Sequence, residues 1–196
     1  MQERIFGDRE KAMEEAYFRG EDAKLLQKLR QRADLDEIAI ALGQKLQVDN
    51  PDLLRRVREL GITADAAPAF FVAPLVQVAW AEGKVSRQEH DTVLRLARER
   101  GIQPSSPAYA QLEEWLRVRP SDEFFETAVE VLKLGFSVLP PAEREERIVS
   151  IVRACQEVAE SSATIGRLLG FSDGVSKLEA SMLDDITRKL RRRVNP

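Results

Sequence analysis

The chain has 196 residues, of which 43% are hydrophobic and 32% charged, and its formal net charge is −3. This length allows one sizeable core or two small ones, and the composition is too polar for insertion into a membrane. Charges of both signs are interspersed, which argues against a specific nucleic-acid surface. An apolar run of about 18 residues does not occur and the first residues include acids, so we expect a cytoplasmic protein.

Cysteine occurs once, at Cys155. One cysteine forms no intrachain disulfide and builds no cysteine metal cage, so we expect Cys155 to pack as a small hydrophobe.

The first predicted helix spans residues 8–32, and a second spans residues 34–46. The first is charge-dense yet carries the aromatic pair Tyr17 and Phe18. Exposed aromatic side chains commonly contact a partner. Two interpretations stay open: the pair docks the helix onto the rest of the protein, or it binds another protein.

Residues 6–19 resemble the inhibitory helix of the F-type ATP synthase inhibitor family. That resemblance implies a helix that enters a catalytic interface, with aromatic anchors and charged contacts that fix its orientation. The positions that would make these contacts are Phe6, Arg9, Glu14, Glu15, Tyr17, Phe18 and Arg19.

The next helices are predicted from caps and apolar patterning. Asn50 and Pro51 start a helix that ends near residue 60, before Gly61. Residues 66–80 are almost uniformly apolar, which predicts one helix that is buried on all sides, kinked at Pro74 and central to the core.

Helical spacing continues to the end of the chain. We expect helices over residues 86–100, around 109–116, from 121 to 134, from 141 through 159, and over 176–193. The basic residues near the end fit the last turn of a helix, where cations complement the helix dipole.

No stretch shows sustained strand-like alternation, so the sequence predicts an all-α fold. The predicted architecture is a compact helical bundle of two related helix-turn-helix units, preceded by an N-terminal helical arm. The expected parts are the arm at residues 1–33, short linking helices at 34–64 and the main helical domain at 65–196.

A short motif occurs twice. Val-Ser-Arg-Gln-Glu at residues 85–89 recurs as Val-Ser-Lys-Leu-Glu at residues 175–179, and an acid-glycine pair precedes each copy. Ser-x-x-Glu is a capping box, in which the serine and glutamate side chains satisfy each other's backbone amides.

The acids around these two turns allow two interpretations. They are solvated turns and caps, or they hold a hard divalent cation, calcium or magnesium. The four carboxylates in question are Glu82, Glu89, Asp173 and Glu179.

An apolar helix followed by acid-Gly-x-Val-x-x-x-Glu and an amphipathic helix resembles the TerB-like family, a helical module first associated with tellurite resistance. The similarity spans about residues 66–190. It implies a compact helical domain, divalent-cation binding at the acidic turns, and a role in stress response or assembly scaffolding.

We find no glycine-rich phosphate loop, no His/Cys metal spacing and no nucleophile elbow. The leading hypothesis is therefore a non-enzymatic TerB-like protein that binds a protein partner through its N-terminal helix. The alternative is a regulator or inhibitor of a rotary F-type ATPase. The oligomeric state stays open.

Overall fold

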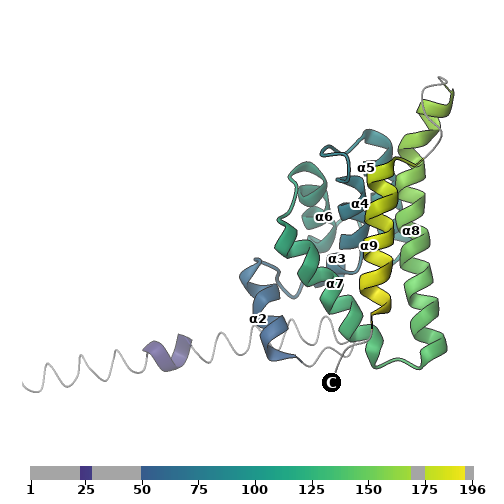
Figure 1. The fold of residues 1–196 in the computed structure, drawn as a ribbon. Helices are drawn as coiled ribbons and strands as arrows, with labels where there is room; N and C mark the ends of the chain where they lie inside the picture. The colour runs from purple at the N-terminus through teal and green to yellow at the C-terminus, as the bar shows by residue number, and fades with distance from the viewer. Residues whose placement is uncertain (1–22, 28–49, 169–174, 193–196) are drawn as a thin grey trace, which may run out of the picture.

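The computed structural model describes residues 23–27, 50–168 and 175–192, without the side chains of residues 163–168. All regular secondary structure in these ranges is helical, which confirms the predicted all-α class. The expected helices over 8–32 and 34–46 lie outside the described residues, except that residues 23–27 are helical. The labelled helices (Figure 1) are α2 (Pro51–Glu59), α3 (Ala67–Phe70), α4 (Ala73–Ala79), α5 (Arg87–Glu99), α6 (Pro107–Arg117), α7 (Asp122–Ser137), α8 (Pro141–Leu168) and α9 (Lys177–Arg191).

Polar caps set the starts of several helices. The Asn50 Oδ1 accepts a hydrogen bond of 3.0 Å from the Leu53 amide, and the Ser121 Oγ accepts one of 3.1 Å from the Phe124 amide. Gly61, after α2, has a φ of 78°, a left-handed conformation that glycine adopts without a Cβ clash. The predicted starts of α2 and α7 and the predicted end of α2 are confirmed.

The single kinked helix predicted over residues 66–80 is wrong. This stretch forms two helices, α3 and α4, separated at Phe71 and Val72. Pro74 lies in the first turn of α4 and does not kink a continuous helix. A proline has no amide hydrogen and fits the first turn of a helix, so the chain restarts there.

Helix α4 lies at the centre of the bundle, as predicted. Its residues Leu75, Val76, Val78 and Ala79 have no exposed surface. It packs against α5, α6, α7, α8 and α9, and α8 and α9 lie antiparallel beside each other (Figure 1). Helices α5, α6, α7, α8 and α9 therefore all bury apolar faces against α4.

An aromatic cluster joins α3, α6 and α7. The Phe124 ring lies 5.1 Å from Phe70, 4.6 Å from Trp115 and 5.3 Å from Phe125, measured between ring centroids. Tilted and edge-to-face arrangements of this kind are favoured by the ring quadrupoles.

Helix α2 belongs to the same core. Its residues Leu53, Leu54 and Val57 are buried in the apolar cluster that also contains α4. The Arg56 guanidinium donates hydrogen bonds of 3.0 Å to Thr127 Oγ1 and 2.9 Å to Glu130 Oε2 on α7. Both apolar and polar contacts thus fix α2 to α7.

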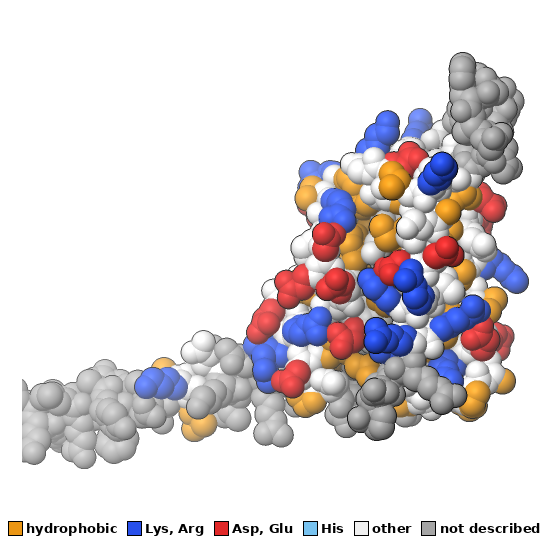
Figure 2. Space-filling model, in the orientation of Figure 1, with side chains coloured by type: hydrophobic (Ala, Val, Ile, Leu, Met, Phe, Trp, Pro, Cys, Tyr) orange, Lys and Arg blue, Asp and Glu red, His pale blue; other side chains and the backbone are white. Residues whose placement is uncertain are grey.

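Acidic and basic side chains are interspersed over the face of the bundle in Figure 2. Among the described residues, no helix combines the length and the apolarity needed to cross a membrane.

Candidate functional site

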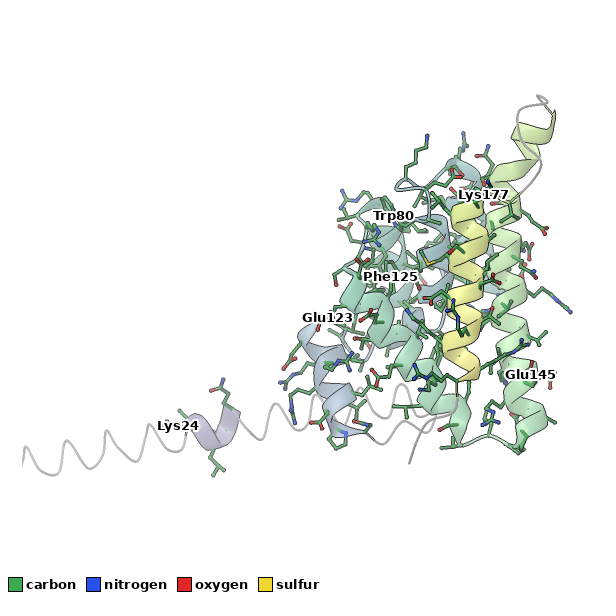
Figure 3. The ribbon with its side chains drawn as sticks, viewed as in Figure 1. Lys24, Trp80, Glu123, Phe125, Glu145 and Lys177 are labelled. Atoms are coloured by element: carbon green, nitrogen blue, oxygen red, sulfur yellow. The ribbon has the colours of Figure 1, made fainter. Side chains whose placement is uncertain are left out.

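The two copies of the repeated motif lie at the same end of the bundle. Helix α4 runs into the turn that starts α5, and α9 begins at the corresponding end of α8. Figure 3 shows Lys177, at the start of α9, at the end of the bundle where Trp80 terminates α4. We call this region the capping end and define it by residues 80–89 and 175–179.

The first turn is fixed by backbone and side-chain bonds. Gly83 has a φ of 80°, and its amide donates to the Trp80 carbonyl over 2.9 Å. The Ser86 amide donates to Glu89 Oε2 over 2.6 Å, while the Glu89 amide donates to Ser86 Oγ over 3.2 Å. The predicted capping box is therefore present.

The second turn repeats this arrangement. The Ser176 amide donates to Glu179 Oε2 over 2.8 Å, and the Glu179 amide donates to Ser176 Oγ over 3.2 Å. The Ser162 hydroxyl, on α8, lies 3.4 Å from the other oxygen, Oε1 of Glu179. The second predicted capping box is also confirmed, and its glutamate additionally contacts the preceding helix.

Both capping glutamates are buried, with 3% of Glu89 and 1% of Glu179 exposed. Burial raises the pKa of the Glu89 carboxyl; its bonds to Ser86 lower that pKa, and the negative charges of Glu179 and Glu82 raise it further. The net direction is upward from the ordinary value. The fold thus brings two acids from distant parts of the sequence into electrostatic contact.

The predicted cation ligands differ in their surroundings. Glu82 is exposed, whereas Glu89 and Glu179 are buried and form the caps. Asp173 lies outside the described residues, as do all the predicted partner-binding positions of the N-terminal segment: Phe6, Arg9, Glu14, Glu15, Tyr17, Phe18 and Arg19. Ser162 was not predicted from the sequence, because its contact with Glu179 depends on how α8 and α9 pack.

The capping end is incomplete as a metal site within the described ranges. There, no three His, Cys, Asp or Glu side chains come close enough to hold a metal ion. The Oε2 atom of each buried glutamate already accepts a backbone hydrogen bond. The described residues alone therefore do not fit a resident metal, and further oxygen ligands would have to come from elsewhere.

Cys155 and His90 are the one cysteine and the one histidine of the chain, two side chains with nucleophilic or acid–base chemistry to consider. Cys155 has no exposed surface, and burial raises the pKa of its thiol to about 12, so it stays protonated. The His90 Nδ1 lies 3.1 Å from Asp91 Oδ1 at the surface.

The basic end of α9 forms ion pairs within the molecule. Lys189 and Arg188 lie 2.8 Å and 3.7 Å from Asp185, and Arg191 lies 2.6 Å from Glu145 on α8. These cations occupy the last turn of the helix, as the sequence predicts.

Comparison with known proteins adds no family to this description. No family model matches the chain, and no curated protein or solved structure gives a significant match.

Proposed function

We propose that this protein is a non-enzymatic, cytoplasmic helical scaffold of the TerB-like type, with a role in stress response or assembly. The observation that carries the proposal is the convergence of two matching capping boxes at one end of the bundle. Such an end is built from two related turns, each fixed by a buried capping glutamate. The engagement of Glu89 and Glu179 in structural bonds, and of Cys155 in the core, also favours binding over catalysis.

Divalent-cation binding at the capping end is part of this proposal. The negative charges of Glu82 and Glu179 repel that of Glu89 and raise its pKa. A cation bound near Glu89 would offset this repulsion. Calcium or magnesium would need further oxygen ligands, and Asp173 is the acid that the second copy of the motif supplies. The site would then consist of Glu82, Glu89, Asp173 and Glu179.

We expect calcium or magnesium to stabilise the protein at a free concentration about tenfold above the dissociation constant. The melting temperature should rise by roughly 3–5 °C, because the ion binds the folded state only. Differential scanning fluorimetry of the full chain measures this shift. Changing Glu82 and Asp173 together to alanine should abolish it.

The control for that experiment is a second pair of acids. Glu113 and Glu126 are exposed on α6 and α7, and their double change to alanine should leave the cation-dependent shift intact. No shift with either ion in the unmodified protein would exclude cation binding while leaving the scaffold proposal to be tested by partner capture.

The second candidate function is inhibition of a rotary F-type ATPase by the N-terminal helix. Its support is the sequence of residues 6–19 and the exposure of two leucines just beyond them. Leu25 and Leu26, within the helical residues 23–27, are 58% and 55% exposed. Large exposed apolar side chains on a charged helix are typical of a segment that binds a partner.

We expect the full-length protein to inhibit ATP hydrolysis by the F-type ATPase of its host. Changing both Tyr17 and Phe18 to alanine should weaken inhibition at least about tenfold, since buried aromatic anchors dominate such interfaces. The matched control removes exposed apolar groups elsewhere, by changing Val118 and Val138 to alanine. Absence of inhibition, or equal inhibition by both variants, would contradict this function.

A further inference from the structure

A short helical segment outside the bundle carries two adjacent exposed leucines. Figure 1 shows residues 23–27, which are helical, well away from the bundle, and Figure 3 labels Lys24 among them. Within this segment Leu25 is 58% exposed and Leu26 is 55% exposed. We call residues 23–27 the leucine segment. An apolar surface that covered both side chains would remove them from water, which is favourable.

The leucine segment differs from the other exposed apolar positions. Each of those is the only large apolar side chain described as exposed on its helix or helix end; they are Val118, Val138, Val149 and Leu178. Single exposed apolar side chains are normal on protein surfaces and need no partner. Among the described residues, the leucine segment alone presents two of them together.

An apolar groove lies at the end of the bundle where α7 leads into α8. It has a volume of about 450 Å³ and is bounded by the second half of α7, the first half of α8, the α3–α4 junction and the end of α5. We call it the α7–α8 groove. The buried Leu132 and Phe136 line it, as do the partly buried Phe71 and Leu139. These side chains pack in the core, so the groove is a preformed apolar surface.

The charged groups of the α7–α8 groove have partners within the molecule. The Arg147 Nη2 lies 3.6 Å from Glu143 Oε1, and the Arg100 Nη1 donates to the Leu96 carbonyl over 3.0 Å. The groove therefore favours an occupant that contacts its apolar side chains and brings no charge to pair. Adjacent leucines on a helix have this chemistry, and helices commonly lay apolar side chains into grooves.

A second copy of the chain supplies both halves of this contact. Within one molecule the leucine segment lies away from the bundle (Figure 1). Two molecules related by a two-fold axis can each place this segment in the other's groove, so two contacts form at once. The exchange buries twice the apolar area of one contact, which matters because stable interfaces bury about 1,200 Å² or more.

We propose that the protein forms a reversible dimer in which the leucine segment of each copy occupies the α7–α8 groove of the other. This assembly goes beyond the proposed scaffold role, because it specifies which surfaces of the chain associate. The groove shares no lining residue with the capping end. Dimerisation and cation binding can therefore fail independently of each other.

Sedimentation equilibrium of the full chain over a wide range of protein concentrations tests the proposal. We expect an equilibrium between monomer and dimer. Changing Leu25 and Leu26 together to glutamate should raise the dissociation constant of the dimer at least about tenfold, because an apolar groove disfavours an unpaired charge. The matched control changes Val118 and Leu178 to glutamate and should leave this constant unchanged. A chain that stays monomeric up to about 1 mM, or a dimer that the leucine changes do not weaken, would overturn the proposal.

A groove variant and a mixing experiment show whose groove the leucines occupy. Ser150 is exposed and lines the groove, so Ser150→Trp should obstruct it and weaken dimerisation. Its melting temperature should match that of the unmodified chain at a concentration where both are monomeric. Mixing this variant with the doubly changed Leu25→Glu, Leu26→Glu variant gives each pair one intact leucine segment and one intact groove. We expect dimers in the mixture and monomers of either variant alone at the same concentration; monomers throughout would contradict exchange between copies.

Discussion

Replacing Phe124 with alanine should lower the free energy of unfolding by about 3–5 kcal/mol, the usual cost of removing a buried aromatic ring. Phe124 is 3% exposed, and its ring contacts those of Phe70, Trp115 and Phe125. Its loss would leave a cavity where α3, α6 and α7 meet. Neighbouring rings fixed by their own helices can fill that cavity only in part.

Urea unfolding followed by circular dichroism measures this effect. Val118→Ala provides the control, because Val118 is 56% exposed and the change should alter stability by no more than about 0.5 kcal/mol. A loss below about 1 kcal/mol for Phe124→Ala would show that the aromatic cluster is not part of the cooperative core.

The second large effect concerns Glu89, where two substitutions should act in opposite directions. Glu89→Ala leaves the Ser86 amide without its acceptor and should cost about 1–3 kcal/mol. Glu89→Gln keeps an oxygen that can accept this bond, since glutamine also serves in capping boxes. It removes the buried negative charge, so at neutral pH this variant should be at least as stable as the unmodified protein.

The pH dependence follows from the direction of the Glu89 pKa shift. The folded-state pKa is raised above the ordinary value of 4.5. The stability associated with this group is then fully present below the unfolded-state pKa and is lost as the pH rises through the folded-state pKa. Glu89→Gln should remove that component of the pH dependence.

Urea titrations of the unmodified protein, Glu89→Ala and Glu89→Gln between about pH 4 and pH 8 measure the stability changes and their pH dependence. Glu123→Gln is the control, because Glu123 is an exposed acid in the first turn of α7. If Glu89→Gln proved as destabilising as Glu89→Ala at neutral pH, the carboxylate charge would be contributing favourably, and the repulsion inferred at the capping end would be wrong.

Local rules predicted the helix starts well. Asn50, Ser86, Ser121 and Ser176 all cap helices where their side chains and the following residues indicate. Each cap depends on neighbours within four residues, so sequence alone is sufficient. The break between α3 and α4 was not predicted, because uniformly apolar residues give no periodicity that marks an end.

The capping end was predicted in its parts but not as a whole. Both capping boxes follow from the sequence, whereas the approach of Glu89 and Glu179 depends on packing among α5, α8 and α9. The burial of Glu89 could nevertheless have been predicted from the sequence. Glu89 lies four and eight residues before Val93 and Ala97, both on the buried face of α5, so helical spacing places the carboxylate on that face.

The buried thiol of Cys155 has a consequence for how folded molecules can associate. It is the one cysteine among the 196 residues, and no part of it reaches solvent. A thiol that is both enclosed and protonated does not attack an external disulfide or react readily with peroxide. Folded copies of these residues are therefore not expected to form disulfide-linked dimers through Cys155 under oxidising conditions.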